Sequence, residues 1–254
     1  MDTSSKILLR VLKFYGWKEF NVIECAKNAY IDSSRPLIGI GQKMTPTKES
    51  DLDKWKKDIY EWIKCRILNY PCNEKNFMDW HIETCDGEEG IIEKSTLLFN
   101  KSYLSLDDPR MKYFGSKLPY GIAQKWLNIT IKNILIGGCI GLPEENEVRR
   151  AFKSLNNVKD IHIPVDSIII GCTKELIKKL QDDGANYKKH FEMLNTSWSR
   201  WTRENYKMYQ EEMWKLLNTL RDKEEYNKRD WCTPIDWEFD VWPKKRDGMS
   251  IFMD

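Results

Sequence analysis

Two residues with reactive side chains, Lys125 and Asp166, each stand where a helix is predicted to begin. Lys125 follows the glycine-bearing run Leu118-Pro-Tyr-Gly-Ile-Ala-Gln, and Asp166 follows the largely apolar run His162-Ile-Pro-Val. A carboxylate in such a position stabilises positive charge that develops on a sugar ring, and it orients or deprotonates a nucleophile. A neutral lysine amine attacks a sugar carbon directly. The two residues therefore have the chemistry needed to cleave a glycosidic bond.

Helices must position these two groups. In residues 51–69, apolar side chains recur at spacings of three and four, which is typical of an amphipathic helix. Similar patterns predict further helices over residues 6–14, 91–99, 123–135, 144–155, 167–181 and 195–225. Prolines and glycines predict irregular segments over residues 33–50 and 70–90, and Gly137-Gly138 is expected to end the helix that contains Lys125.

The predicted fold is mainly α-helical, and 254 residues are enough for one large domain or for two small lobes. We expect two lobes with a cleft between them. The first lobe spans residues 1–110, and the second spans residues 111–254. Within the second lobe we expect a hairpin over about residues 115–135, an insertion over 139–160, the Asp166 helix over 166–181 and tryptophan-rich helices after it.

The composition, 41% hydrophobic and 31% charged, is that of an ordinary soluble globular protein. The sequence has neither a long apolar span nor a secretory signal pattern, so we expect a cytoplasmic protein, nucleoid-associated if it is bacterial. The net charge of +2 neither requires nor excludes nucleic acid, because phosphate binding needs only a local basic patch. Candidate patches, each also interpretable as a solvated surface, are Arg149-Arg150 with Lys153, Lys178-Lys179, and Lys244-Lys245-Arg246.

The cysteines and histidines do not predict a metal site. The seven cysteines are odd in number and none has the C-x-x-C spacing, so neither a zinc site nor an iron–sulfur cluster is expected. We expect reduced thiols, with Cys139 and Cys172 as packing residues in apolar surroundings. His81 and His190 have no ligand-like neighbours in the sequence.

Both reactive runs resemble motifs of the base-excision DNA glycosylases that contain a helix-hairpin-helix, such as 8-oxoguanine glycosylase and endonuclease III. Gly121-Ile-Ala-Gln-Lys125 is similar to the G-V-G-x-K of the bifunctional members, and Pro164-Val-Asp166-Ser is similar to the segment with their catalytic aspartate. The order, lysine before aspartate, is also that of the family. The chain differs in the extra Tyr120, in Ala123 at the second glycine, in a longer spacer and in lacking a four-cysteine cluster motif. The resemblance covers roughly residues 115–180.

The resemblance implies a DNA glycosylase that flips a damaged or modified base out of duplex DNA and cleaves its N-glycosidic bond. Asp166 would be catalytic, and Lys125 would form the Schiff base that permits strand nicking by β-elimination. The hairpin residues would grip the DNA backbone through amides at a helix start, and they are Gly121, Ile122, Ala123 and Gln124. No cofactor is implied, although the hairpin leaves room for a monovalent cation.

The expected partner is double-stranded DNA with a damaged or modified base, and we expect a monomer. The base is not identified, and a hypermodified phage base, which would make this a defence enzyme, is one option. Candidates for holding the flipped base are Tyr120, Trp126, His162, Trp198 and Trp201. Most of the tryptophans lie at helical spacing with apolar residues, which also predicts core positions.

Two other functions remain open. A non-catalytic helix-hairpin-helix module would use the hairpin only to bind phosphates. A helical protein-interaction protein would have both motifs by coincidence, since Val-Asp-Ser is also an ordinary helix N-cap. DNA affinity that survives Asp166→Asn without an abasic product would favour the binding module, and the interaction protein would show no DNA affinity.

Overall fold

A computed structural model of the chain describes residues 19–33, 46–71, 76–101, 117–139, 142–155, 158, 160–182, 187–221, 231 and 233–252. The described residues are mainly helical and include no strand, which confirms the predicted mainly α-helical class. None of the helices in these ranges is long and apolar enough to cross a membrane. The helix predicted over residues 6–14 and the predicted lobe boundary at 110/111 lie outside the described residues.

Packing divides the chain into two compact units. Unit 1 is Met1–Leu118 with Lys125–Val158, and unit 2 is Pro119–Gln124 with Lys159–Asp254. The first turn of one helix, α7 (Tyr120–Gly138), is therefore assigned to unit 2 and the rest of that helix to unit 1.

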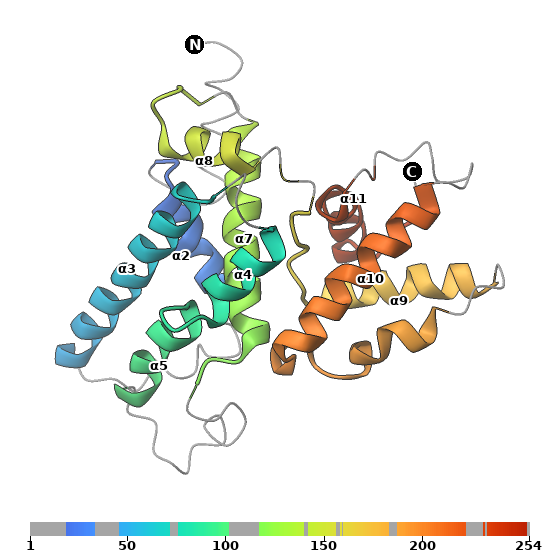
Figure 1. The fold of residues 1–254 in the computed structure, drawn as a ribbon, viewed down its shortest axis with the longest axis horizontal. Coiled ribbons are helices and arrows are strands. Elements are labelled where there is room, and N and C mark those ends of the chain that lie inside the picture. The colour runs from blue at the N-terminus through green and yellow to red at the C-terminus, as the bar shows by residue number, and fades with distance from the viewer. Residues whose placement is uncertain are drawn as a thin grey trace. The chain divides into compact units, whose positions relative to one another are not determined.

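Unit 1 is built from helices only, in the part of it that the structure describes (Figure 1). Besides most of α7, these are α2 (Val22–Ser33), α3 (Pro46–Leu68), α4 (Phe77–Asp86), α5 (Ile91–Lys101) and α8 (Glu147–Leu155). α3 packs against α2, α5 and α8, and α4 packs against α5. Ile59, Ile63 and Ile67 of α3 are at most 3% exposed, which agrees with the periodicity that predicted this helix.

Aromatic side chains join α2, α3 and α7 in the core of unit 1. The Trp126 ring lies 4.9 Å from the Tyr30 ring and 6.0 Å from the Tyr60 ring, between ring centroids. Its indole Nε1 donates a hydrogen bond of 2.9 Å to the carbonyl of Ala26. Because a buried tryptophan needs a partner for this N–H, the contact fixes α7 on α2.

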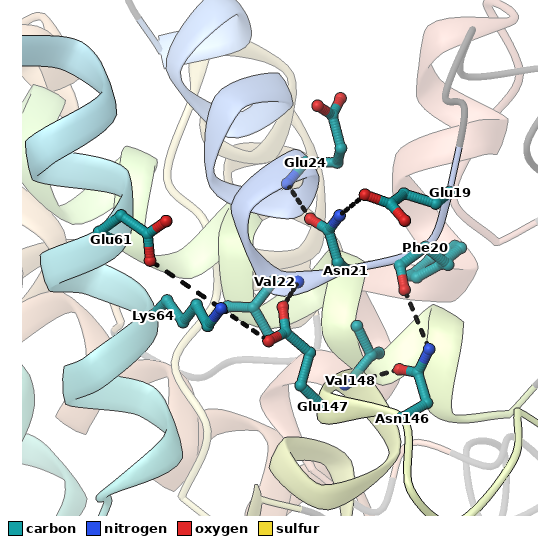
Figure 2. Close-up of polar contacts among 10 residues, drawn as sticks. All are labelled: Glu19, Phe20, Asn21, Val22, Glu24, Glu61, Lys64, Asn146, Glu147 and Val148. Carbon is teal, nitrogen blue, oxygen red and sulfur yellow. Dashed lines mark hydrogen bonds and ion pairs between the residues drawn. The ribbon is translucent and has the colours of Figure 1, made fainter. Parts of the chain in front are cut away.

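Glu147, the first residue of α8, connects three helices of unit 1 (Figure 2). Its carboxylate accepts a hydrogen bond of 2.8 Å from the Val22 amide at the start of α2, and it lies 2.8 Å from the Lys64 ammonium of α3. The hydrogen bond to Glu147 raises the pKa of Lys64. A carboxylate here also interacts favourably with the N-terminal dipole of α2.

Two asparagines cap the helices that Glu147 connects (Figure 2). Asn21 accepts from the Glu24 amide at 2.8 Å, and Asn146 accepts from the Val148 amide at 2.8 Å. Asn146 also donates to the Phe20 carbonyl at 3.2 Å, so the starts of α2 and α8 are bound to each other.

Unit 2 contains α9 (Ser167–Asp182), the short 3-10 helices η2 (Lys188–Asn195) and η3 (Trp198–Arg200), α10 (Arg203–Arg221) and α11 (Pro234–Arg246) (Figure 1). α9 packs against α11 and η2, and α10 packs against η2 and α11. Thr233 and Asp236 form a capping box at the start of α11. The predicted helix after Asp166 is confirmed as α9.

Two segments predicted to be irregular are partly helical. Within residues 70–90 the structure forms α4, whose start is capped by the Asn76 side chain at the Met78 amide. Pro71 lies before α4 and Gly87 lies directly after it, so neither residue is inside the helix. α3 begins at Pro46, inside the predicted irregular segment 33–50, because proline is well suited to a first helical turn. Residues 34–45 lie outside the described ranges.

Some predicted helix boundaries are wrong. Residues 195–221 are not one helix: η3 precedes α10, and Thr196 and Trp201 have extended backbones. α7 begins at Tyr120 rather than at residue 123, so Gly121 is helical and does not form a turn before the helix. α7 continues to Gly138, beyond the predicted end at Leu135, so Gly137 and Gly138 belong to the helix and do not form the expected glycine cap after it.

Candidate functional site

Asp166 lies directly before α9 and caps it through its side chain. Oδ1 accepts a hydrogen bond of 2.9 Å from the Ile169 amide, and Oδ2 lies 3.5 Å from the indole Nε1 of Trp242 on α11. The residue is half-buried. A carboxylate at this position interacts favourably with the dipole of α9, and it remains partly accessible.

The thiol of Cys172 on α9 is not a nucleophile. Burial, together with the negative charges of Glu175 and Asp166, raises the pKa of Cys172 to about 12, so the thiol stays protonated. Its side chain is fully buried, which confirms the predicted packing role. The same prediction is wrong for Cys139, which is exposed.

Lys125 belongs to unit 1 and has a partner there. Its ammonium donates to the carbonyl of Asp32 on α2 at 3.4 Å, and the residue is 8% exposed. Lys125 is the sixth residue of α7, beyond the first turn, whereas the sequence placed it at the start of the helix. The effect of a helix dipole falls off within the first turn, and Lys125 lies beyond that turn.

The start of α7 is buried. Gly121, Ile122, Ala123 and Gln124 are all buried, and the amides of Ile122 and Ala123 both donate to the Pro119 carbonyl at 3.0 and 3.2 Å. A β-carbon on Gly121 would overlap the carbonyl oxygen of Trp198, so this glycine allows a close approach within unit 2. Contact of these four residues with DNA stays a prediction, and it requires the start of α7 to become accessible.

The aromatic candidates for base binding are mostly core residues. Tyr120 is 6% exposed and packs on Tyr206, with ring centroids 5.5 Å apart. Trp201 is 1% exposed and donates its indole N–H to the Met193 carbonyl at 3.1 Å. Trp126 is 1% exposed in the core of unit 1, and Trp198 is half-buried.

His162 is a hydrogen-bonded core residue. Its Nδ1 lies 2.8 Å from the Tyr206 hydroxyl, and it is 4% exposed. This arrangement agrees with the packed alternative for this histidine. Unit 2 therefore contains Asp166, His162, Tyr120, the Gly121–Gln124 turn of α7 and both Trp198 and Trp201, whereas Lys125 and Trp126 are in unit 1.

Acidic neighbours offset the charge of two predicted basic patches. Arg149 and Lys153 both pair with Glu144. At the end of α11, each basic residue has an acidic partner: Lys244 with Asp240, Lys245 with Glu175 and Arg246 with Asp247. Lys178-Lys179 on α9 remains a candidate patch.

A Cys–His–Asn cluster in unit 1 escaped the sequence analysis. His81 Nε2 lies 2.9 Å from Asn128 Oδ1, and the Cys85 sulfur lies 3.8 Å from His81 Nδ1. Burial lowers the pKa of His81 to about 3, so the imidazole is neutral. All three side chains are at most 1% exposed, so the cluster gives a substrate no access and serves packing. The i, i+4 spacing of His81 and Cys85 was visible in the sequence, but the contact with α7 was not.

Sequence analysis also missed Trp242 and Gln210, two side chains close to the run that ends at Asp166. Trp242 comes from α11, and Gln210 of α10 binds the backbone of Ile163. Neither has a local pattern that links it to the run, because both contacts join segments far apart in the chain. The described residues contain no group of His, Cys, Asp and Glu side chains able to hold a metal ion.

Comparison with known proteins identified no relative of this chain. No family model, curated protein or solved structure matches this chain.

Proposed function

We propose that the chain is a DNA glycosylase that depends on Asp166 and releases a damaged or modified base from duplex DNA. The observation that supports this most directly is the position of Asp166, a partly accessible carboxylate held at the start of α9. It ends a Pro-Val-Asp run similar to the aspartate segment of the helix-hairpin-helix glycosylases. The two-lobed fold, the cleft and the helix-hairpin-helix belong to this proposal.

In the proposed reaction Asp166 acts electrostatically. Cleavage of an N-glycosidic bond develops positive charge on the sugar ring, and a fixed carboxylate stabilises that charge. The carboxylate also orients the attacking water. Base release by this route does not need Lys125.

Strand nicking needs Lys125 as a neutral nucleophile at the sugar carbon C1′. In the structure its ammonium binds the Asp32 carbonyl. Nicking therefore requires this contact to break, and we propose base release as the primary activity, with β-elimination as a secondary one.

A second candidate is a helical protein without catalysis. The burial of residues 121–124 and the close approach of Gly121 to Trp198 favour it, because they give the glycine motif a role inside unit 2. This candidate gives the Asp166 motif only the role of a helix cap.

The test is an assay of free base and abasic sites on duplexes with a panel of damaged bases and on phage genomic DNA. Asp166→Asn keeps the helix cap and removes the charge, and we expect it to lower base release by about a hundredfold or more. Asp160→Asn makes the same chemical change at an exposed position and should keep full activity.

Addition of borohydride tests Lys125 in the same assay. A trapped covalent complex that disappears in Lys125→Gln would support nicking through Lys125. No base release from any substrate, or equal release by Asp166→Asn, would overturn the enzyme proposal. DNA affinity without base release would favour the non-catalytic binding module.

A further inference from the structure

The run before Asp166 is buried but belongs to no helix. Ile161, His162, Ile163 and Val165 are each at most 4% exposed. Buried backbone N–H and C=O groups need hydrogen-bond partners, and an extended segment usually finds them in a neighbouring strand. Among the described residues there is no strand, so other groups must supply the partners.

Two glutamine side chains satisfy alternate residues of this run. Gln210 of α10 accepts from the Ile163 amide at 3.0 Å and donates to the Ile163 carbonyl at 2.9 Å. Gln124 of α7 accepts from the Val165 amide at 3.5 Å and donates to the Val165 carbonyl at 3.2 Å. Each carboxamide thus pairs with both backbone groups of one residue, as a partner strand does in a sheet.

The remaining residues of the run fit this pairing. Pro164 stands between the two paired residues and has no N–H, so no amide there lacks a partner. The hydroxyl of Tyr206, one turn before Gln210 on α10, lies 2.8 Å from His162 Nδ1. Gln124 and Gln210 are 0% and 4% exposed, so water competes little for their carboxamides.

We propose that Gln124 and Gln210 are positioning residues that place the Asp166 carboxylate, and this inference rests on the proposed function of Asp166. Gln124 binds Val165, the residue bonded to Asp166, and the carboxylate itself caps the Ile169 amide. The aspartate is thus fixed from both sides. Small displacements of a catalytic group lower the rate steeply, so loss of either glutamine slows the reaction without removing a group that touches substrate.

Amide hydrogen exchange in the full chain, followed by NMR, tests the pairing without a substrate. Methionine has a similar length and cannot reproduce the paired hydrogen bonds. We expect exchange at the Ile163 amide to rise about fivefold or more in Gln210→Met, and at the Val165 amide in Gln124→Met. Tyr206→Phe removes the hydroxyl that contacts His162 and keeps both glutamines, so it should leave both rates unchanged.

Kinetics then separate positioning from a general loss of stability. Both glutamine variants should lower kcat for base release, and in Gln210→Met KM for the duplex should stay the same. Tyr206→Phe should keep the wild-type kcat. If Gln124→Met does not fold, exchange at the Ile163 amide and kcat in Gln210→Met test the proposal. Unchanged exchange at Ile163 and Val165 overturns the positioning role. Base release by Asp166→Asn at the wild-type rate overturns the proposed function instead and leaves the exchange result standing.

Discussion

Each compact unit holds a carboxylate at the start of a helix, and the two carboxylates are bound differently. Glu147 of unit 1 lies 2.8 Å from an amide and 2.8 Å from the Lys64 ammonium (Figure 2). Asp166 of unit 2 binds the Ile169 amide at 2.9 Å, and its other oxygen lies 3.5 Å from the indole N–H of Trp242. Glu147 therefore has a cation and an amide among its contacts, and the contacts of Asp166 include an amide and an indole N–H.

The contacts around each carboxylate also differ between the two units. In unit 1 an ion pair and helix caps bind α2, α3 and α8 together. In unit 2, two carboxamides bind the run that ends at Asp166, and Gly121 lies close to the carbonyl of Trp198. The contacts of Glu147 join three helices of unit 1, and under our proposal those around Asp166 place its carboxylate.

The largest expected effect concerns the close contact in unit 2. Gly121→Ala would place a β-carbon on the Trp198 carbonyl oxygen, so we expect a loss of about 3 kcal/mol in the free energy of unfolding. Urea denaturation followed by tryptophan fluorescence measures it.

Gly171→Ala is the matched control on α9. Its β-carbon would meet Lys245 Cε at 3.6 Å, an ordinary contact, so helix propensity should make this variant more stable by up to about 1 kcal/mol. Equal stability of the two variants would show that the close approach of α7 does not order unit 2.

The next effect concerns the ion pair of unit 1. Glu147→Ala removes the acceptor of the Val22 amide and the partner of Lys64, and it should cost about 2 kcal/mol of unfolding free energy. Glu144→Ala, which removes an exposed partner of Lys153, should change the urea midpoint little. A similar small effect from Glu147→Ala would contradict the stabilising role of this carboxylate.

Local sequence signals predicted the elements with local causes. The spacing of Ile59, Ile63 and Ile67 predicted α3, and the aspartate N-cap predicted α9 with its start at Ser167. The apolar pattern over residues 91–99 predicted α5. These signals depend on neighbouring residues, so one sequence is enough to read them.

Contacts between distant segments could not be predicted in this way. Gly121 was read as a turn, whereas its lack of a side chain serves the contact with Trp198. Nothing in the sequence indicated that the carboxamide of Gln124 binds Val165. Only the folded chain brings these partners together, and no spacing in the sequence encodes them.

The third effect is the response of unit 1 to acid, which depends on His81. Burial lowers the pKa of His81 in the folded state to about 3, against about 6.5 in the unfolded chain. The stability from this neutral histidine is therefore fully present above pH 6.5 and is lost as pH falls toward 3. The slope should reach about 1.4 kcal/mol per pH unit.

Urea midpoints of the wild type and His81→Gln between pH 4 and 7 measure this contribution. The variant should be less stable at pH 7, because glutamine fits the site of the His81 ring less well. Its stability should also fall less steeply with acid. Parallel curves for the two proteins would show that His81 does not govern the acid response of unit 1.

The smallest effect tests the cap of α9 directly. Asp166→Ala removes the hydrogen bond to the Ile169 amide and should cost about 1 kcal/mol of unfolding free energy. Asp166→Asn should cost less, because asparagine caps a helix about as well as aspartate. Glu147→Ala, by contrast, removes a cation's partner as well as a hydrogen bond, so it should cost more than Asp166→Ala. If Asp166→Asn were as damaging as Asp166→Ala, the charge of Asp166 would stabilise unit 2 as that of Glu147 stabilises unit 1. The carboxylate would then be structural in both units, and the contrast between them would fail.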